Sequence, residues 1–256
     1  AAALIFTVKE DIESADIALV NQEVILGGTE IGLSGYPAFN GPFEVGDALV
    51  NAGFDVILHA TNHALDRSDT GVLNCINFWK TNHPDIDFIG INSSQEEMTK
   101  VHIHDIDGIK IVILNYTYGT NGIEPPEGMP YAVNYLDEDT LARDISYAEE
   151  NADFTVVCPH WGTEYIHTVD ESQKYWANIM IENGADLIIG PHPHVIEPIE
   201  EINGVPVFWS LGNFINSPAE EGEGVADRML GAMAKVTLSK GDDGKISVKE
   251  FKALLF

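Results

Sequence analysis

The amino-acid sequence predicts a mixed α/β (α+β) fold, in which mixed β-sheets are flanked by helices. Two observations predict it. The first is a pattern that occurs four times: an Asp, preceded by a small or apolar residue, opens a short apolar run that ends in polar residues able to bind a metal, at Asp16, Asp55, Asp153 and Asp186. The second is that segments with helical periodicity separate these runs, which is typical of α/β proteins.

Length and composition indicate an ordinary globular chain. It has 256 residues, 45% of them hydrophobic, without a composition break or an internal repeat, so we expect a single domain over residues 1–256. No apolar stretch approaches the ~18 residues of a membrane span. Residue 1 is not Met, and we expect any leader or anchor to lie outside this sequence. Two cysteines, Cys75 and Cys158, are too few for a disulfide framework, and we expect buried free thiols.

The charge of the chain argues against one class of partner. There are 41 Asp and Glu residues against 13 Lys and Arg, a formal net charge of −28. Nucleic-acid binding needs a basic face that neutralises phosphates, so we expect no nucleic acid as a partner. Two explanations of the surplus carboxylates stay open: solubility in a salty or extracellular medium, and a ring of carboxylates around a cation site.

The first half of the chain alternates strands with helices. Short β-branched runs predict the strands, and apolar residues at helical spacing predict the helices. A long Gly-rich stretch follows the first strand, and such a loop is more often functional than idle. We predict strands at 17–20, 55–60 and 86–91, a loop at 24–41, and helices at 9–15, 42–52 and 71–82, the last capped by Asp69 or Thr70.

The second half adds hairpins. Asp107-Gly108 and Asn203-Gly204 are strong two-residue turn signals between apolar runs. The remaining segments repeat the alternation of the first half. We predict hairpins within 101–114, 195–209 and 232–251, a loop at 116–131, helices at 137–151 and 171–183, and strands at 153–157 and 186–189.

Two histidines follow the strand predicted at 186–189. That strand stops at Gly190-Pro191, and His192 and His194 come next, one residue apart. Because alternate side chains of an extended segment point the same way, we expect both imidazoles to face one point beyond the carboxyl end of a buried strand. Open α/β sheets bind ligands at that end, and imidazole is the commonest metal-binding side chain.

Two other predicted strands also end in residues that can bind a metal. Asn62-His63 follows one strand and His160 follows another, and amide oxygen and imidazole are both metal ligands. Asp66 is spaced to orient His63, as carboxylates beside metal-site histidines do. Taken singly, the Asn62-His63 turn is better explained by a capping or surface role, and His160 alone is an equally weak signal. Together with His192 and His194 they predict a shared metal site. We assign packing or surface roles to the remaining histidines: His59, His83, His102, His104 and His167.

Five ordered motifs carry a family resemblance. They are Asn21-Gln22-Glu23, Thr61-Asn62-His63-Ala64-Leu65-Asp66, His160-Trp161-Gly162-Thr163-Glu164, Gly190-Pro191-His192-Pro193-His194 and Ser210-Leu211-Gly212-Asn213-Phe214. In their order and spacing the sequence resembles the bacterial capsule synthesis proteins called CapA or PgsA, which are associated with poly-γ-glutamate. The resemblance implies a metallophosphoesterase-like sandwich of mixed β-sheets flanked by helices.

The resemblance also implies a site with divalent metal ions, for which Mn, Fe and Zn are about equally suitable. The implied ligands are Asn62, His160 and His192 for one metal and His194 for the other, with Glu23 as a bridge. The implied catalytic residues are His63, which protonates the leaving group, and Asp66 beside it. We expect substrate contacts from Asn21, Trp161, Glu164 and Asn213.

One departure from the family pattern concerns the metal that His194 serves. The first strand of the family normally ends in Gly-Asp, which supplies a carboxylate to that metal, and no Gly-Asp precedes Asn21 here. Either that strand lies outside this sequence or the protein lacks it. The carboxylate ligand therefore has no assigned residue.

Three functions fit these observations. The first is a metal-dependent hydrolase or transferase that acts on a phosphoester or γ-glutamyl linkage of a cell-surface polymer. The second is a non-catalytic subunit that binds or helps export poly-γ-glutamate within a membrane synthase complex. The third, reached by fold analogy, is a small-molecule phosphoesterase. The resemblance further implies an extracytoplasmic bacterial protein, anchored to the membrane through an N-terminal segment absent from this chain.

Overall fold

The computed structural model describes residues 2–215 and 224–256. The chain forms two compact units. Unit 1 comprises Ala1–Lys100 and Asn115–Leu136, and unit 2 comprises Val101–Leu114 and Asp137–Phe256. A single domain over residues 1–256 stays a prediction.

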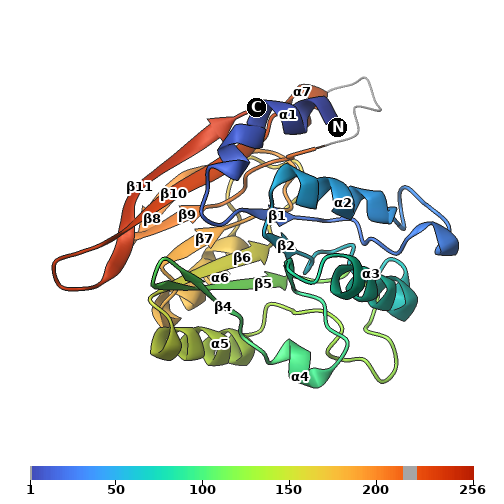
Figure 1. The fold of residues 1–256 in the computed structure, drawn as a ribbon, viewed down its shortest axis with the longest axis horizontal. Coiled ribbons are helices and arrows are strands. Elements are labelled where there is room, and N and C mark those ends of the chain that lie inside the picture. Colours follow the sequence, from blue (N-terminus) through green and yellow to red (C-terminus); the bar gives the residue numbers. More distant parts are fainter. Residues whose placement is uncertain (1, 216–223) are drawn as a thin grey trace. The chain divides into compact units, whose positions relative to one another are not determined.

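Unit 1 contains a parallel three-stranded sheet in the order β1-β2-β3, and Figure 1 labels the first two of these strands. The central strand β2 is buried at all three positions, which accounts for its continuous apolar run. Because the strands are parallel, their carboxyl ends lie at the same edge. The elements are α1 (Ala2–Glu13), β1 (Leu19–Asn21), the 3-10 helix η1 (Thr29–Ile31), α2 (Phe43–Ala52), β2 (Val56–Leu58), α3 (Ser68–Asn82), β3 (Asp87–Ile89) and α4 (Gln95–Met98).

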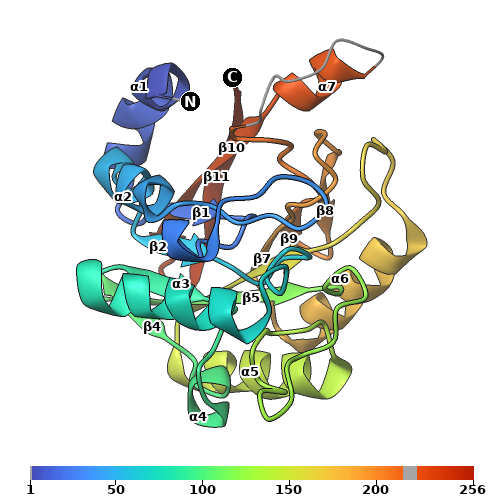
Figure 2. The same ribbon diagram turned by 90° about the vertical axis from the view of Figure 1, so that its right-hand side faces the viewer.

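Helices α2 and α3 pack closely together, and both lie beside β2 in the two ribbon views (Figures 1 and 2). A Cβ atom at Gly46 of α2 would lie 2.4 Å from the ring of Phe78 in α3, so glycine permits this approach. The helix α3 begins three residues before the predicted start. The predicted cap at Asp69 or Thr70 is wrong, because both residues lie in the first turn and Arg67 occupies the N-cap, where its side chain makes no capping hydrogen bond.

Unit 2 contains a six-stranded mixed sheet in the order β4-β5-β6-β7-β9-β8. The pairs β6–β7 and β7–β9 are parallel, whereas β4–β5 and β8–β9 are antiparallel hairpins. Helices α5 and α6 pack on one another, as Figure 2 shows. The elements are β4 (Ile103–Ile106), β5 (Ile109–Thr117), α5 (Glu138–Asn151), β6 (Phe154–His160), α6 (Glu171–Asn183), β7 (Leu187–Ile189), β8 (Ile199–Ile202), β9 (Val205–Phe208), α7 (Val225–Met229), β10 (Ala232–Lys240) and β11 (Ile246–Leu255).

The predicted hairpins are confirmed, and their turns explain why. Asp107 and Gly108 have φ values of 52° and 83°, and Asn203 and Gly204 have 53° and 87°. Two consecutive positive φ values are typical of the type I′ turn, whose twist matches that of paired strands. No sequence pattern predicts η1, α4 or α7, because three to five residues are too few to show helical periodicity.

Both cysteines are buried thiols outside any disulfide, as predicted. Burial raises the pKa of the Cys75 thiol and of the Cys158 thiol to about 12. Neither thiol is therefore a reactive thiolate near neutral pH.

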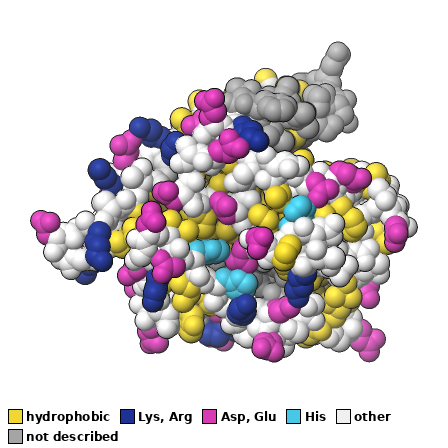
Figure 3. Space-filling view, in the orientation of Figure 1, with side chains coloured by type: hydrophobic (Ala, Val, Ile, Leu, Met, Phe, Trp, Pro, Cys, Tyr) yellow, Lys and Arg dark blue, Asp and Glu magenta, His cyan; other side chains and the backbone are white. Residues whose placement is uncertain are grey.

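The surplus of acidic residues is visible on the molecular surface. Asp and Glu side chains are scattered over the face drawn in Figure 3 instead of gathering at one spot. This distribution favours a role in solubility over a single ring around a cation. Within the described residues, none of the helices combines the length and apolar character that crossing a membrane requires.

Candidate active site

In unit 1, the motif residues lie at the carboxyl ends of the parallel strands β1 and β2, at one edge of the sheet. Asn21 ends β1, and the segment that follows is bonded to the segment after β2. The backbone N–H of Gln22 donates to the carbonyl oxygen of Leu58 at 2.9 Å. The hydroxyl of Thr61 donates to the backbone carbonyl of Glu23 at 2.8 Å. These bonds place Glu23 beside the Thr61–His63 turn within this unit.

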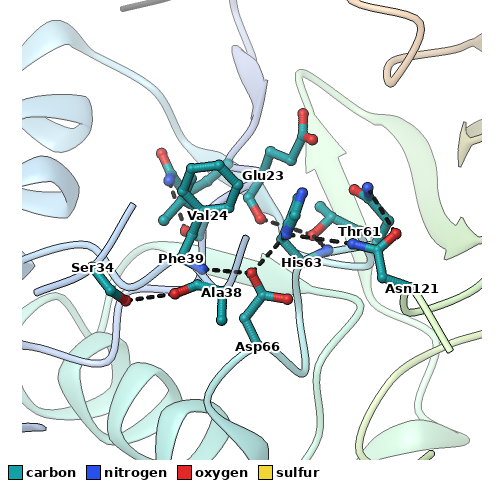
Figure 4. Close-up of polar contacts among 11 residues, drawn as sticks. Glu23, Val24, Ser34, Ala38, Phe39, Thr61, His63, Asp66 and Asn121 are labelled. Atoms are coloured by element: carbon teal, nitrogen blue, oxygen red, sulfur yellow. Dashed lines mark hydrogen bonds and ion pairs between the residues drawn. The ribbon is translucent and has the colours of Figure 1, made fainter. Parts of the chain in front are cut away.

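His63 is oriented by Asp66, as their spacing predicts. Nδ1 of His63 lies 2.6 Å from Oδ2 of Asp66, whose side chain is 1% exposed. The same oxygen accepts the backbone N–H of Phe39 at 2.7 Å, and the Phe39 ring meets the His63 ring edge-on at 4.6 Å. Figure 4 shows these contacts, with the Glu23 carboxylate directed away from Asp66. The carboxylate holds the Nδ1 proton, so Nε2 is the atom suited to proton transfer.

Asn62 and Asn21 are polar residues at the same edge of the unit 1 sheet. Asn62 is 1% exposed, and its amide nitrogen donates to Oδ1 of Asn121 at 3.4 Å. The side-chain oxygen of Asn21 is buried and makes no hydrogen bond to any residue in the described part of the chain. Because buried polar atoms normally have partners, this oxygen marks a place for a donor or a cation.

Phe39 and Asn121 are neighbours of His63 that the sequence does not predict. Nδ2 of Asn121 lies 3.5 Å from Nδ1 of His63. Both residues come from the two long loops, and no local pattern links them to the Asn62-His63 turn. The glycine content and length of the first loop were the only signal, and they indicated a functional loop without naming a residue.

In unit 2, the parallel strands β6 and β7 bring histidines together. His160 ends β6, and His192 follows β7 by three residues. They are 0% and 5% exposed, their ring centroids are 4.8 Å apart, and each offers a ligand atom within 4.8 Å of the other. The ring of His194 lies 6.0 Å from that of His192. The expectation of an extended segment is wrong, because His192 and His194 have φ values of 102° and 60°.

His194 has a defined tautomer. Asn213 donates from Nδ2 to the backbone carbonyls of His194 at 3.1 Å and Arg228 at 2.9 Å. Its Oδ1 therefore faces Nδ1 of His194, 2.9 Å away, and accepts that proton. The lone pair of the imidazole is then on Nε2, the usual arrangement for a metal ligand. The ring of Tyr165 stacks on the His194 ring, with 5.7 Å between their centroids. The Arg228 guanidinium lies over the Tyr165 ring, 5.2 Å from its centroid.

The two remaining predicted substrate residues differ in placement. Trp161 is 1% exposed, donates to the backbone carbonyl of Trp209 at 3.0 Å and stacks on its ring. Trp161 therefore packs in the core, and its contact with substrate stays a prediction. Glu164 is half-buried. Burial of the Tyr165 hydroxyl raises its pKa most, and the negative charge of Glu164 raises that pKa further.

The histidines of unit 2 fit a divalent metal. Two buried imidazoles with facing ligand atoms and a third with its lone pair on Nε2 form a donor set that suits Mn, Fe or Zn. Glu23 and Asn62 belong to unit 1. Their role as ligands of the same centre stays a prediction.

Comparison with known proteins gives a family and a fold. The model of the family described as bacterial capsule synthesis protein PGA_cap matches residues 2–218. The PGA biosynthesis protein CapA of Bacillus subtilis (strain 168) is 35% identical over 170 residues, which is 65% of this chain and 44% of that protein. The capsule biosynthesis protein CapA of Bacillus anthracis is 30% identical over 177 residues, 67% of this chain and 42% of that protein. The chain thus spans less than half the length of these relatives.

Solved structures show the same fold at low identity. A protein described as a candidate 5′-nucleotidase from Staphylococcus aureus, in complex with alpha-ketoglutarate, has a TM-score of 0.65 and 14% identity, over 99% of this chain and 48% of that chain. The sulfate thiohydrolase SoxB of Thermus thermophilus, in complex with glycerol, has a TM-score of 0.59 and 16% identity, over 99% and 41%. The predicted metallophosphoesterase-like class of mixed sheets and flanking helices is confirmed.

Proposed function

Because this chain belongs to the family of bacterial capsule synthesis proteins whose model matches residues 2–218, we propose that it is a metal-dependent hydrolase or transferase of a cell-surface polymer. The linkage it acts on is a phosphoester or a γ-glutamyl bond. The observation that supports this proposal is the histidine group of unit 2, His160, His192 and His194, which presents imidazole donors at the carboxyl ends of parallel strands.

The metal ligands proposed in unit 2 are these three histidines. A divalent metal, when bound, polarises a phosphoryl or carbonyl oxygen of the substrate. Asn213 keeps His194 in the tautomer that offers Nε2. Glu23 and Asn62 are proposed as further ligands on the strength of their motifs, and substitution of each tests that assignment by metal content.

The proposed acid is His63. The buried Asp66 carboxylate accepts the Nδ1 proton and stabilises the charged imidazolium, so that Nε2 can release a proton to a leaving group. Phe39 holds Asp66 through its N–H and covers one edge of the imidazole. The pair is thereby positioned before substrate binds.

The proposed substrate is an acidic polymer such as poly-γ-glutamate, because relatives are named for PGA and capsule biosynthesis. We propose that the protein works outside the cytoplasm, with a membrane synthase complex as its partner. A chain with a net charge of −28 repels a polyanion at long range. Docking of such a substrate therefore depends on bound metal or on local cationic side chains.

Metal content per chain tests the proposal. We would purify the protein without chelator or nickel affinity resin and measure bound metals by elemental analysis. The decisive variant is His192→Ala. The matched control is His167→Ala, because His167 is exposed and bonds the backbone carbonyl of Ile196 through Nδ1.

One or two metals per chain, retained in the His167 variant and lost in the His192 variant, support the proposal. Turnover of a panel of phosphoesters and oligo-γ-glutamates then names the linkage. Absence of metal from the wild type, even after soaking with Mn²⁺ or Zn²⁺, contradicts the proposal and favours the non-catalytic polymer-binding or export subunit.

A further inference from the structure

We infer that a pocket in unit 1 beside Asp66 is a subsite for an anionic group of the substrate, a carboxylate or a phosphate, which Arg67 binds. This inference rests on the proposed action on an acidic polymer and extends it to substrate recognition. The pocket has a volume of about 450 Å³. Its lining residues are Ile31, Leu65, Asp66, Arg67, Ser68, Thr70 and Ile123.

Arg67 is the only basic residue lining this pocket, and its geometry is defined. Nη2 donates to the backbone carbonyl of Ile31 at 2.7 Å, which holds the guanidinium at the wall. A Cβ atom at Gly71 would lie 2.6 Å from Cβ of Arg67, so glycine makes room for the stem of the side chain. The guanidinium is thus fixed before a ligand arrives, which lowers the ordering cost of binding.

Within the described part of the chain, no carboxylate is paired with the Arg67 guanidinium. Among the residues that the structure describes it forms no ion pair, and it uses one hydrogen bond of the five N–H donors that a guanidinium carries. A planar fork of N–H groups matches the two oxygens of a carboxylate or a phosphate.

The hydrogen bonds of the acidic side chains at the pocket go to groups other than Arg67. The Asp66 oxygen Oδ2 accepts from the Phe39 N–H and faces His63. Asp69, outside the lining, accepts the backbone N–H of Thr70. The apolar side chains of Ile31 and Ile123 also line the pocket, and such a surface suits a short aliphatic stem, such as the methylenes of a glutamyl residue. Since Asp66 belongs both to the pocket and to the His63 pair, a bound anion lies next to the proposed acid.

The test is anion binding by the full chain, measured by calorimetry with and without chelator. The probes are tri-γ-glutamate and inorganic phosphate. We compare the wild type with Arg67→Gln and Arg67→Lys. The matched control is Arg143→Gln, which removes an arginine of α5 paired with Asp144.

We expect the wild type to bind at least one probe in both conditions. Arg67→Gln should weaken that binding about tenfold or more, as loss of a charge-assisted hydrogen bond predicts. Arg67→Lys should retain part of it, and Arg143→Gln all of it. Preferential binding of tri-γ-glutamate identifies a carboxylate site, and preferential binding of phosphate identifies a phosphate site.

Equal binding by the wild type and Arg67→Gln overturns the inference, as does absence of binding of both probes by the wild type. Metal content separates this result from failure of the proposed function. If the protein holds no metal but still binds the probe through Arg67, the subsite is supported and the proposed hydrolase is contradicted. If the protein binds metal but its binding of the probes does not depend on Arg67, the proposed hydrolase is supported and the subsite is contradicted.

Discussion

Oδ2 of Asp66 lies 2.6 Å from Nδ1 of His63, three residues earlier in the chain, and the same oxygen accepts the N–H of Phe39. One carboxylate oxygen thus orients the proposed acid and fixes the Gly-rich loop against it. Asp66 therefore has two roles within unit 1: it orients the proposed acid and it holds the loop. Substitutions can test the two roles separately.

Replacement of His63 by Ala should lower turnover of a phosphoester or oligo-γ-glutamate by about 10²–10⁴-fold, the usual contribution of a general acid. Asp66→Asn should lower kcat and alter its pH profile, because an amide nitrogen facing Nδ1 disfavours the tautomer with the Nδ1 proton. Steady-state kinetics over pH would check both. Circular dichroism and metal content serve as controls for folding. A His63→Ala protein with wild-type kcat would exclude its role as the acid.

Gly90→Ala should destabilise unit 1 strongly. Gly90 has φ of 104°, and a Cβ atom there would lie 2.3 Å from the backbone nitrogen of Ala60 and 2.4 Å from Oδ1 of Asn115. Those two atoms form a hydrogen bond of 2.7 Å with each other, so the methyl group would disrupt it. We expect a loss of about 3–5 kcal/mol in the free energy of unfolding, measured by denaturant titration.

The control for that substitution is Gly108→Ala. Gly108 also has a positive φ, 83°, but among the described residues no atom beyond its two chain neighbours lies within 4 Å of its Cβ position. Backbone strain then costs about 1–2 kcal/mol. If the two substitutions cost the same, the close approach at Gly90 has no energetic weight.

Stability should fall between about pH 4.5 and pH 7 through Glu197. Burial raises the pKa of this carboxyl from 4.5 to about 7, opposed by the hydrogen bond that Gln173 donates to it. Because the folded state keeps its proton while the unfolded state has lost it, unfolding is favoured as pH rises across that interval. Above about pH 7 both states are ionised and this contribution is constant.

Glu197→Gln should therefore remove part of that slope. The measurement is the free energy of unfolding of wild type and variant at intervals from pH 4 to pH 8, with Glu201→Gln, at an exposed position of β8, as a control for loss of a charge. The absolute stability of the variant also reflects the new amide, so the comparison concerns the slope. Parallel curves for wild type and Glu197→Gln would contradict the prediction.

Metal should stabilise the protein through the histidine group of unit 2. At a free Mn²⁺ or Zn²⁺ concentration of 100 times Kd, binding to the folded state adds about 2.7 kcal/mol, which thermal unfolding detects as a higher Tm. Chelator should reverse the shift. His192→Ala should abolish it and His167→Ala should keep it. A shift of equal size in His192→Ala would place the binding elsewhere.

Much of the architecture could be predicted because it depends on neighbours in sequence. The Asp-Gly and Asn-Gly turns specify their own backbone, so the hairpins around Gly108 and Gly204 were predictable. The apolar runs of β2 and β7 identified buried strands. The polar residues that follow such strands indicated which side chains gather at the sheet edge, as His160 and His192 do.

What only the tertiary structure decided depends on residues far apart in the chain. Phe39 meets Asp66 across 27 positions, Asn121 meets His63 across 58 and Asn213 fixes the tautomer of His194 across 19. Loop paths set these contacts, and no short-range periodicity encodes a loop path. The sequence by itself therefore determined the strands, the turns and the candidate ligands, and tertiary packing decided how each imidazole is oriented.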